Sequence, residues 1–166
     1  MTAQEFNKLV ELHADGLYRF ILKNSGNEAE AEDVVQDAFE KLWLNHEKIE
    51  FEKGKSWLFS AGYHTMIDHI RRSKKISYME EHHENSQYTT ESYTGTADML
   101  QKAVDLLPEA QKSVLMLRDY EGYTYQEIAG ITGLNEGQVK VYIHRARIFL
   151  RDKIEKMENY YASQQA

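Results

Sequence analysis

Apolar residues recur every three or four positions along most of this chain, which is the spacing of one face of an α-helix. The pattern predicts a first helix whose apolar face runs from Phe6 to Ile21 and which ends near Asn24–Gly26. Asn27 is placed to cap a second helix, with Glu30 at the position of a capping box. The inner side of that second helix carries Ala31, Val34, Val35, Ala38, Leu42 and Trp43.

The helical pattern resumes after a polar loop, which is expected at Asn45–Gly54. A third helix is predicted from about Lys55 to Arg72. Its expected core positions are Trp57, Leu58, Ala61 and Ile67. Between Ser73 and Ala97 the periodicity is lost and Ser, Thr, Tyr, Glu and His predominate, which predicts a flexible linker.

A second group of helices follows that linker. Met99–Leu107 begins it, Pro108 suits the first turn of the next helix, and Gly122 ends that helix. The sequence therefore predicts an all-α fold of two small helical domains. Their predicted extents are residues 1–74 and 98–157, with the flexible linker at 75–97 and a polar, frayed tail at 158–166.

Residues 124–153 have the pattern of two helices joined by a tight turn. Thr124 and Glu127 form a capping box at the start of the first helix, and Gly133 breaks the pattern where the turn is needed. Asn135 offers an N-cap for the second helix. This arrangement is typical of a helix-turn-helix, whose second helix enters the major groove of DNA.

The second helix of this motif has two different faces. One is an apolar stripe of Val139, Ile143, Ala146 and Leu150. The other carries Lys140, His144, Arg147 and Arg151 at the same period. The first face suits a core and the second suits phosphates. The alternative is a helical hairpin whose basic face is simply solvated, but the double cap and the one-sided charge favour DNA binding.

The charge of the chain changes this picture, because its formal net charge is −7. Acidic residues crowd into Glu28–Glu52, whereas Arg71–Lys75 and Lys140–Arg151 are basic. A chain with two basic patches is expected to bind DNA weakly by itself, since non-specific affinity scales with the phosphates neutralised. We infer that a helper holds it on DNA. The acidic segment is the candidate docking surface, and the alternative is an ordinary solvated face.

Several kinds of chemistry are absent from the sequence. There are no cysteines, which excludes disulfides and Cys-based zinc sites and suits a cytoplasmic setting. No phosphate loop, nucleophile elbow or HExxH motif occurs, so we expect no enzymatic activity and no cofactor. His82 and His83 are expected to be solvated rather than metal-bound. No apolar run approaches the roughly 20 residues of a membrane helix, so no direct membrane insertion is expected.

Three motifs, in order, resemble the extracytoplasmic-function (ECF) group of bacterial RNA polymerase sigma factors, over nearly the whole chain. Ala31–Trp43, AEDVVQDAFEKLW, is similar to the family's polymerase-docking segment. Ser56–Arg72, SWLFSAGYHTMIDHIRR, is similar to the segment that reads the downstream (-10) promoter element. Leu107–Arg147 resembles the reader of the upstream (-35) element. The resemblance implies a subunit that binds core RNA polymerase and directs promoter-specific transcription initiation.

The resemblance also implies roles for individual residues. In the first domain, conventionally region 2, contacts to the clamp helices of the largest polymerase subunit are expected from Asp33, Val35, Gln36, Asp37 and Phe39. Contacts to the -10 element are expected from Trp57, Tyr63, His64, Asp68, Arg71 and Arg72. In the second domain, conventionally region 4, contacts to the -35 element are expected from Lys140, Val141, Tyr142, His144, Arg145, Arg147 and Arg151.

The chain departs from the family pattern at both reading surfaces. Tyr63 and His64 stand where Arg and Asn are frequent, which leaves the preferred base open, and the residues alone leave a packing role equally open. Val141 and Tyr142 replace a common Ser-Arg pair. Arg145 can contact guanine edges or phosphates, and Val141 can touch a thymine methyl group.

The family further implies control by an anti-sigma factor. Two other functions stay open from the residues alone. One is a conventional helix-turn-helix regulator that binds an operator as a symmetric dimer, and the other is an interaction protein with a degenerate helix-turn-helix. The acidic helix combined with the aromatic and basic third helix favours the sigma factor.

Overall fold

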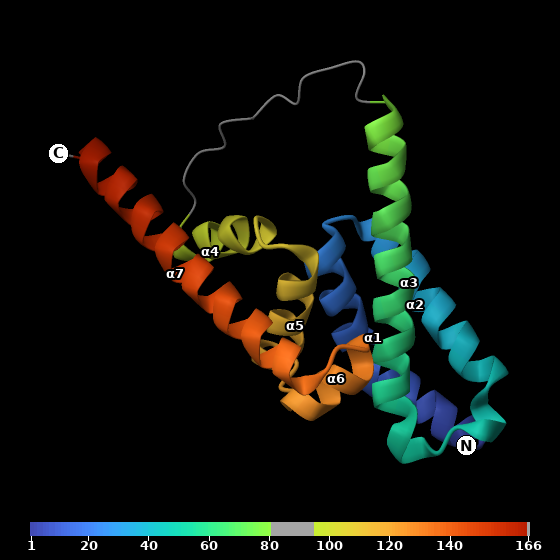
Figure 1. The fold of residues 1–166 in the computed structure, drawn as a ribbon. Coiled ribbons are helices and arrows are strands. Elements are labelled where there is room, and N and C mark those ends of the chain that lie inside the picture. The colour runs from blue at the N-terminus through green and yellow to red at the C-terminus, as the bar shows by residue number, and fades with distance from the viewer. Residues whose placement is uncertain (81–94, 166) are drawn as a thin grey trace.

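A computed structural model describes residues 1–80 and 95–165 of the chain. Within these ranges the chain forms seven α-helices and one short 3-10 helix, with no strand, and the all-α prediction is confirmed. No helix in the described ranges is both long enough and apolar enough to cross a membrane. Figure 1 shows two groups of helices, which we call the N-terminal module (α1–α3) and the C-terminal module (α4–α7).

The N-terminal module consists of α1 (Ala3–Ser25), α2 (Glu28–Leu44), the 3-10 helix η1 (His46–Lys48) and α3 (Phe51–Glu80). Gly26, at φ 70°, ends α1, and the next helix starts directly after it because the Asn27 side chain accepts a hydrogen bond from the Glu30 N–H at 3.0 Å. Both signals were predicted and are confirmed. The three helices pack pairwise around a core that includes Leu17, Phe20, Ile21, Val34, Leu42, Leu58 and Met66.

Two predictions about this module need correction. Trp43 was expected on the inner side of α2, but it is 42% exposed, because it lies at the end of the helix, edge-on to Phe6 and stacked on His46. The expected polar loop is also shorter, because α3 begins at Phe51. At its other end α3 continues to Glu80, beyond the predicted boundary at residue 74. The remaining part of the predicted linker, residues 81–94, lies outside the described residues and contains His82 and His83.

The C-terminal module consists of α4 (Thr96–Asp105), α5 (Glu109–Asp119), α6 (Tyr125–Thr132) and α7 (Glu136–Gln165). The predicted helix-turn-helix is α6 and α7. The Thr124–Glu127 capping box opens α6, and Gly133 ends it at φ 78°. Asn135 and Gln138 then exchange reciprocal hydrogen bonds of 2.8 and 3.0 Å at the start of α7.

Helix α7 is longer than the sequence pattern indicated. The residues expected as a frayed tail continue the helix to Gln165. Figure 1 shows this last part running past α4, and the two helices are in contact. Met99 of α4 and Tyr161 of α7 line one hollow, so the final turns have a partner that is distant in sequence.

The two modules pack against each other, with α3 beside α6 and α1 beside α5 (Figure 1). Ser60 of α3 donates a hydrogen bond to the Ile131 carbonyl at 3.1 Å, and the Phe59 ring packs edge-on against Tyr123 with centroids 5.4 Å apart. The buried apolar residues of both modules therefore form one continuous cluster. We call this arrangement the closed form.

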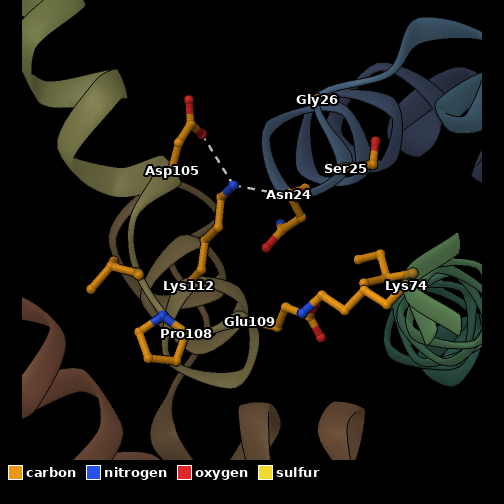
Figure 2. A pocket seen from close by; sticks show the side chains of 10 residues that line it. Asn24, Ser25, Gly26, Lys74, Asp105, Pro108, Glu109 and Lys112 are labelled. Carbon is orange, nitrogen blue, oxygen red and sulfur yellow. Dashed lines mark hydrogen bonds and ion pairs between the residues drawn. The ribbon is translucent and has the colours of Figure 1, made fainter. Parts of the chain in front are cut away.

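Polar bonds join the modules at a second place, beside a cavity of about 440 Å³ (Figure 2). Lys112 of α5 is 8% exposed, and its ammonium donates to the Asn24 carbonyl at 3.3 Å and pairs with Asp105 at 3.1 Å. The Ser113 hydroxyl donates to Asn24 Oδ1 at 3.0 Å. Lys74 of α3 and Glu109 of α5 form an ion pair across the same cavity. Asn24, at the end of α1, is thus the centre of this second contact.

Gly54 of α3 provides a direct test of the packing of α1 on α3. A Cβ atom at Gly54 would collide with Cδ1 of Leu9, which is 2% exposed, so the leucine side chain or one of the two helices must shift. Gly54→Ala is therefore expected to lower the free energy of unfolding by about 1–3 kcal/mol. Urea denaturation followed by circular dichroism measures the change.

Gly130 of α6 is the matched control, because a Cβ there would meet nothing within 4 Å among the described residues. Gly130→Ala removes only backbone freedom and should raise the free energy of unfolding by about 0.5–1 kcal/mol. Equal effects of the two substitutions would contradict the described packing.

Candidate docking face and nucleic-acid interface

The outer side of α2 presents acidic and polar side chains. Asp33 and Gln36 are exposed and Asp37 is half-buried. Val35 and Phe39 are half-buried on the flank toward the core, and Phe39 packs edge-on against Phe6 of α1 with centroids 6.3 Å apart. The two apolar residues thus lie between the acidic face and the core. This face is suited to a positively charged partner, since opposite charges steer and orient an encounter.

The acidic face ends in an exposed apolar edge that the sequence analysis missed. Trp43 is 42% exposed and Leu44 is 73% exposed, at the last turn of α2. The spacing from Asp33 to Asp37 to Leu44 continues one helical face. A signal was present in the sequence, because Leu44 follows Trp43 and both cannot point into one narrow core.

The predicted -10 residues do not all share one surface. His64, Asp68, Arg71 and Arg72 are exposed on α3. Tyr63, in contrast, is 7% exposed, and burial raises the pKa of its phenol. The side of α3 that carries it packs against the C-terminal module, so Tyr63 is covered in the closed form.

Trp57, the remaining member of that predicted set, lines a cavity of about 370 Å³ between the start of α3 and the segment before it. The other lining residues are Asn45, Lys48, Ile49, Glu50 and Lys53. The Met1 ammonium donates to the carbonyls of His46 and Ile49 at 2.6 and 2.9 Å, which fixes this segment. An indole ring beside amide, ammonium and carboxylate groups suits an unstacked nucleobase. Lys48 and Lys53 were not predicted, because the sequence indicated a polar loop at Asn45–Gly54, whereas Lys48 ends η1 and Lys53 lies in the first turn of α3.

The first turns of α7 present the predicted -35 residues. Lys140, Val141, His144 and Arg145 are exposed, and Tyr142 is half-buried. They stand opposite the apolar stripe, in which Val139, Ile143 and Ala146 are at most 1% exposed. Ile148, 50% exposed and seven residues after Val141, extends this surface and was not predicted. The result is a helix with a buried inner face and an exposed basic outer face, on which Lys140 pairs with Glu136 at 3.2 Å.

Arg147 has a partner within the protein. Its guanidinium holds the Asp119 carboxylate of α5 through bonds of 2.7 and 3.4 Å, and this hydrogen bonding raises the pKa of Arg147. The side chain therefore joins α7 to α5, and in this form it does not project toward a phosphate. Arg151, one turn further, is exposed. Within the described ranges no group of three or more His, Asp and Glu side chains is arranged to hold a metal ion.

Comparisons with known proteins match both modules of the chain to one family. The family model described as Sigma-70 region 2 matches residues 9–76, and the one described as Sigma-70, region 4 matches residues 97–150. The ECF RNA polymerase sigma factor SigE of Mycolicibacterium smegmatis is 32% identical over 161 residues, and this chain spans 62% of its length. RNA polymerase sigma factor SigV of Bacillus subtilis is 32% identical over 148 residues, which are 87% of each chain.

Solved structures share the fold. The sigma factor RpoE in complex with the anti-sigma factor NepR, from Bartonella quintana, has a TM-score of 0.77 and 24% identity, covering 92% of this chain and 98% of that one. CnrH in complex with the cytosolic domain of CnrY has a TM-score of 0.67 and 23% identity, covering 91% and 88%. At these identities the likeness concerns the fold alone.

Proposed function

Because the chain belongs to the ECF group of bacterial RNA polymerase sigma factors, we propose that it binds core polymerase and directs initiation at promoters with defined -10 and -35 elements. The observation that carries this proposal is the pairing of two modules in one chain: an acidic docking helix in the first and a basic reader helix in the second. The N-terminal module (α1–α3) serves as region 2, and the C-terminal module (α4–α7) serves as region 4.

The outer face of α2 docks on the clamp helices of the largest polymerase subunit. Asp33, Gln36 and Asp37 supply the polar contacts, and Val35 and Phe39 support them from the flank. Exposed Trp43 adds a large apolar contact at the end of the same helix. Aromatic side chains at the centre of an interface commonly dominate its binding energy, whereas charges at the rim mainly set the encounter rate.

The -10 element is read by the exposed side of α3 together with the cavity beside Trp57. Arg71 and Arg72 hold the phosphate backbone, and His64 and Asp68 offer hydrogen bonds to base edges. The cavity receives one base that has left the duplex stack, and stacking and edge hydrogen bonds offset the few kcal/mol that unstacking costs. Tyr63 joins this surface only when the C-terminal module moves away.

The -35 element is read in the major groove by the first turns of α7. Lys140, His144 and Arg145 reach bases or phosphates, Val141 offers a contact to a thymine methyl group, and Tyr142 borders them. Arg151 binds a phosphate, which fixes the register of the helix without reading sequence. Arg147 holds α7 against α5 through its bond to Asp119, and in this way it helps to position the reader helix.

Polymerase binding supplies the affinity that the protein lacks, since the net charge of −7 opposes binding to DNA. This activity takes place in the cytoplasm, where polymerase and promoters are found. An anti-sigma factor is the expected inhibitor, as it is the partner of the sigma factor in the RpoE structure.

Reconstituted transcription with purified core polymerase and a promoter library tests the proposal. Promoter-specific initiation that depends on this chain is the expected result. A conventional helix-turn-helix regulator, the alternative function, would instead bind a palindromic duplex tightly as a dimer and would leave core polymerase inactive at every promoter.

The docking face is tested by Asp33→Ala combined with Gln36→Ala. Because both exposed side chains leave the interface, affinity for core polymerase should fall at least about tenfold, the range of an interface hot spot. Fluorescence anisotropy with labelled protein measures the affinity, and circular dichroism should show an unchanged fold.

Glu155→Ala is the control for the docking face. Glu155 is an exposed acid on α7, in the other module, and the substitution changes the net charge by the same amount. It should leave the affinity nearly unchanged. Retained polymerase binding in the Asp33/Gln36 variant would remove the docking assignment.

The reader helix is tested by Arg145→Ala. Loss of a base contact should weaken use of the preferred -35 sequence by about 1–3 kcal/mol, with affinity for polymerase unaltered. The measurement is initiation from promoters that differ only in this element.

Lys156→Ala is the control for the reader helix, because it removes the same charge from a later turn of α7, where Lys156 pairs with Asp152 at 3.0 Å. An equal loss on all upstream sequences with Arg145→Ala would identify Arg145 as a phosphate contact, without a role in reading.

A further inference from the structure

The first turn of α7 carries an acidic side chain that the sequence analysis did not assign to the reader surface. Glu136 is the first residue of this helix and is exposed. Its Oε1 atom is 3.2 Å from the ammonium of Lys140, one turn later, which is also exposed. We call these two residues the reader pair. A helix-turn-helix contacts base edges with the N-terminal residues of its second helix, and the reader pair stands at that end.

The Lys140 ammonium is held by contacts with both helices of the motif. Besides its bond to Glu136, it lies 5.6 Å from the centroid of the Tyr125 ring of α6, within the range of a cation–π contact. Arg118 of α5 is next to the same ring, with its guanidinium carbon 4.7 Å from the centroid. An ammonium has three N–H donors. One serves Glu136 and one faces the ring, so a third can serve an acceptor outside the protein.

The Glu136 carboxylate has acceptor capacity left as well, because only its Oε1 atom is engaged by Lys140. The reader pair therefore presents a donor and an acceptor side by side, with 3.2 Å between the two atoms. In the major groove, the amino group of one base and the carbonyl oxygen of its partner are hydrogen-bonded to each other and lie about 2.9 Å apart. The two separations match, so each charge can lie over the group that it attracts.

We propose that Glu136 and Lys140 together read one base pair of the -35 element, with Lys140 over a guanine and Glu136 over the cytosine that is paired with it. The Lys140 ammonium donates to guanine O6, and the Glu136 carboxylate accepts from the cytosine N4 amino group. The inference rests on the proposed function, because reading of a duplex promoter is what brings α7 into a major groove.

The reader pair distinguishes all four base pairs. Guanine presents N7 beside O6, so the ammonium meets two acceptors, whereas thymine presents O4 and an apolar methyl group. T·A in the same orientation is therefore second to G·C. In the reversed pairs, C·G and A·T, an amino group faces the ammonium and a carbonyl oxygen faces the carboxylate. Both charges then lose water without gaining a partner, so these two pairs are rejected.

A second pair on α7 separates base reading from stabilisation of the helix. Asp152 and Lys156 have the same spacing and pair at 3.0 Å. They lie about 24 Å further along the helix than the reader pair, beyond the reach of a groove about 12 Å wide. An acid four residues before a lysine stabilises a helix slightly wherever it occurs. Only the reader pair is therefore expected to affect the choice of base pair.

The test uses the holoenzyme, reconstituted from the full chain and core polymerase, on a promoter library that varies each position of the -35 element. The unmodified chain should prefer G·C over C·G at one position by at least about tenfold. Glu136→Ala should lower that preference at least about fivefold, because the reversed pairs no longer face a carboxylate. Lys140→Ala should lower it at the same position. Asp152→Ala is the control and should leave every preference unchanged.

Exchange of the two charges gives a second readout. Glu136→Lys with Lys140→Glu keeps the net charge and the spacing of the pair, but it places the ammonium where the carboxylate was. The preferred base pair at the affected position should therefore change from G·C to C·G. Asp152→Lys with Lys156→Glu is the matched exchange and should change no preference. Circular dichroism should show the same helix content in all these variants.

Four results would overturn the inference: no position that prefers G·C, a preference that survives Glu136→Ala, effects of the two alanine variants at different positions, or a charge exchange that keeps G·C. In each case the unmodified chain still initiates, so the proposed function stands. A chain that initiates at no promoter would remove the proposed function and this inference together.

Discussion

Helix α3 packs on both modules at once, and the arrangement of the other helices depends on this double burial. One side of α3 completes the three-helix core with Leu58 and Met66, and another places Phe59 and Ser60 against α6. The result is one continuous apolar cluster, in which buried side chains of both modules are shielded from water together. Apolar burial is the dominant favourable term in such contacts, and here the same helix also carries exposed Arg71 and Arg72.

The closed form separates two kinds of functional surface. The acidic face of α2 and the basic face of α7 remain accessible, so closure hides neither the proposed docking face nor the proposed reader face. What closure covers is Tyr63 and Phe59 of α3, and it places the ammonium groups of Lys23 and Lys55 over rings of the C-terminal module. Both proposed binding faces are thus accessible in the closed form, whereas the side of α3 that carries Tyr63 becomes accessible only after the modules part.

The uneven distribution of charge explains how an acidic protein is compatible with this function. The net charge of −7 opposes non-specific DNA binding, and acidic residues are concentrated in Glu28–Glu52, which includes the face proposed to dock on polymerase. Part of the positive charge is also engaged inside the protein. Arg147 is bound to Asp119 and Lys112 to Asp105, and Lys23 and Lys55 lie over the rings of Tyr120 and Tyr123. Fewer cations are therefore free to bind DNA than the sequence alone indicates.

Local signals in the sequence determined the helices, their caps and the helix-turn-helix, because a cap or an apolar stripe involves residues only three or four positions apart. Asn27, Thr124 and Gly133 act as predicted for this reason. Tertiary structure alone decided the exposure of Trp43, the burial of Tyr63, the partner of Arg147 and the length of α7, since each depends on a residue from another helix. The contacts of Lys23 with Tyr120 and of Lys55 with Tyr123 are the extreme case. The lysines come from α1 and α3 and the rings from the turn after α5, so only the packing of the two modules brings them together.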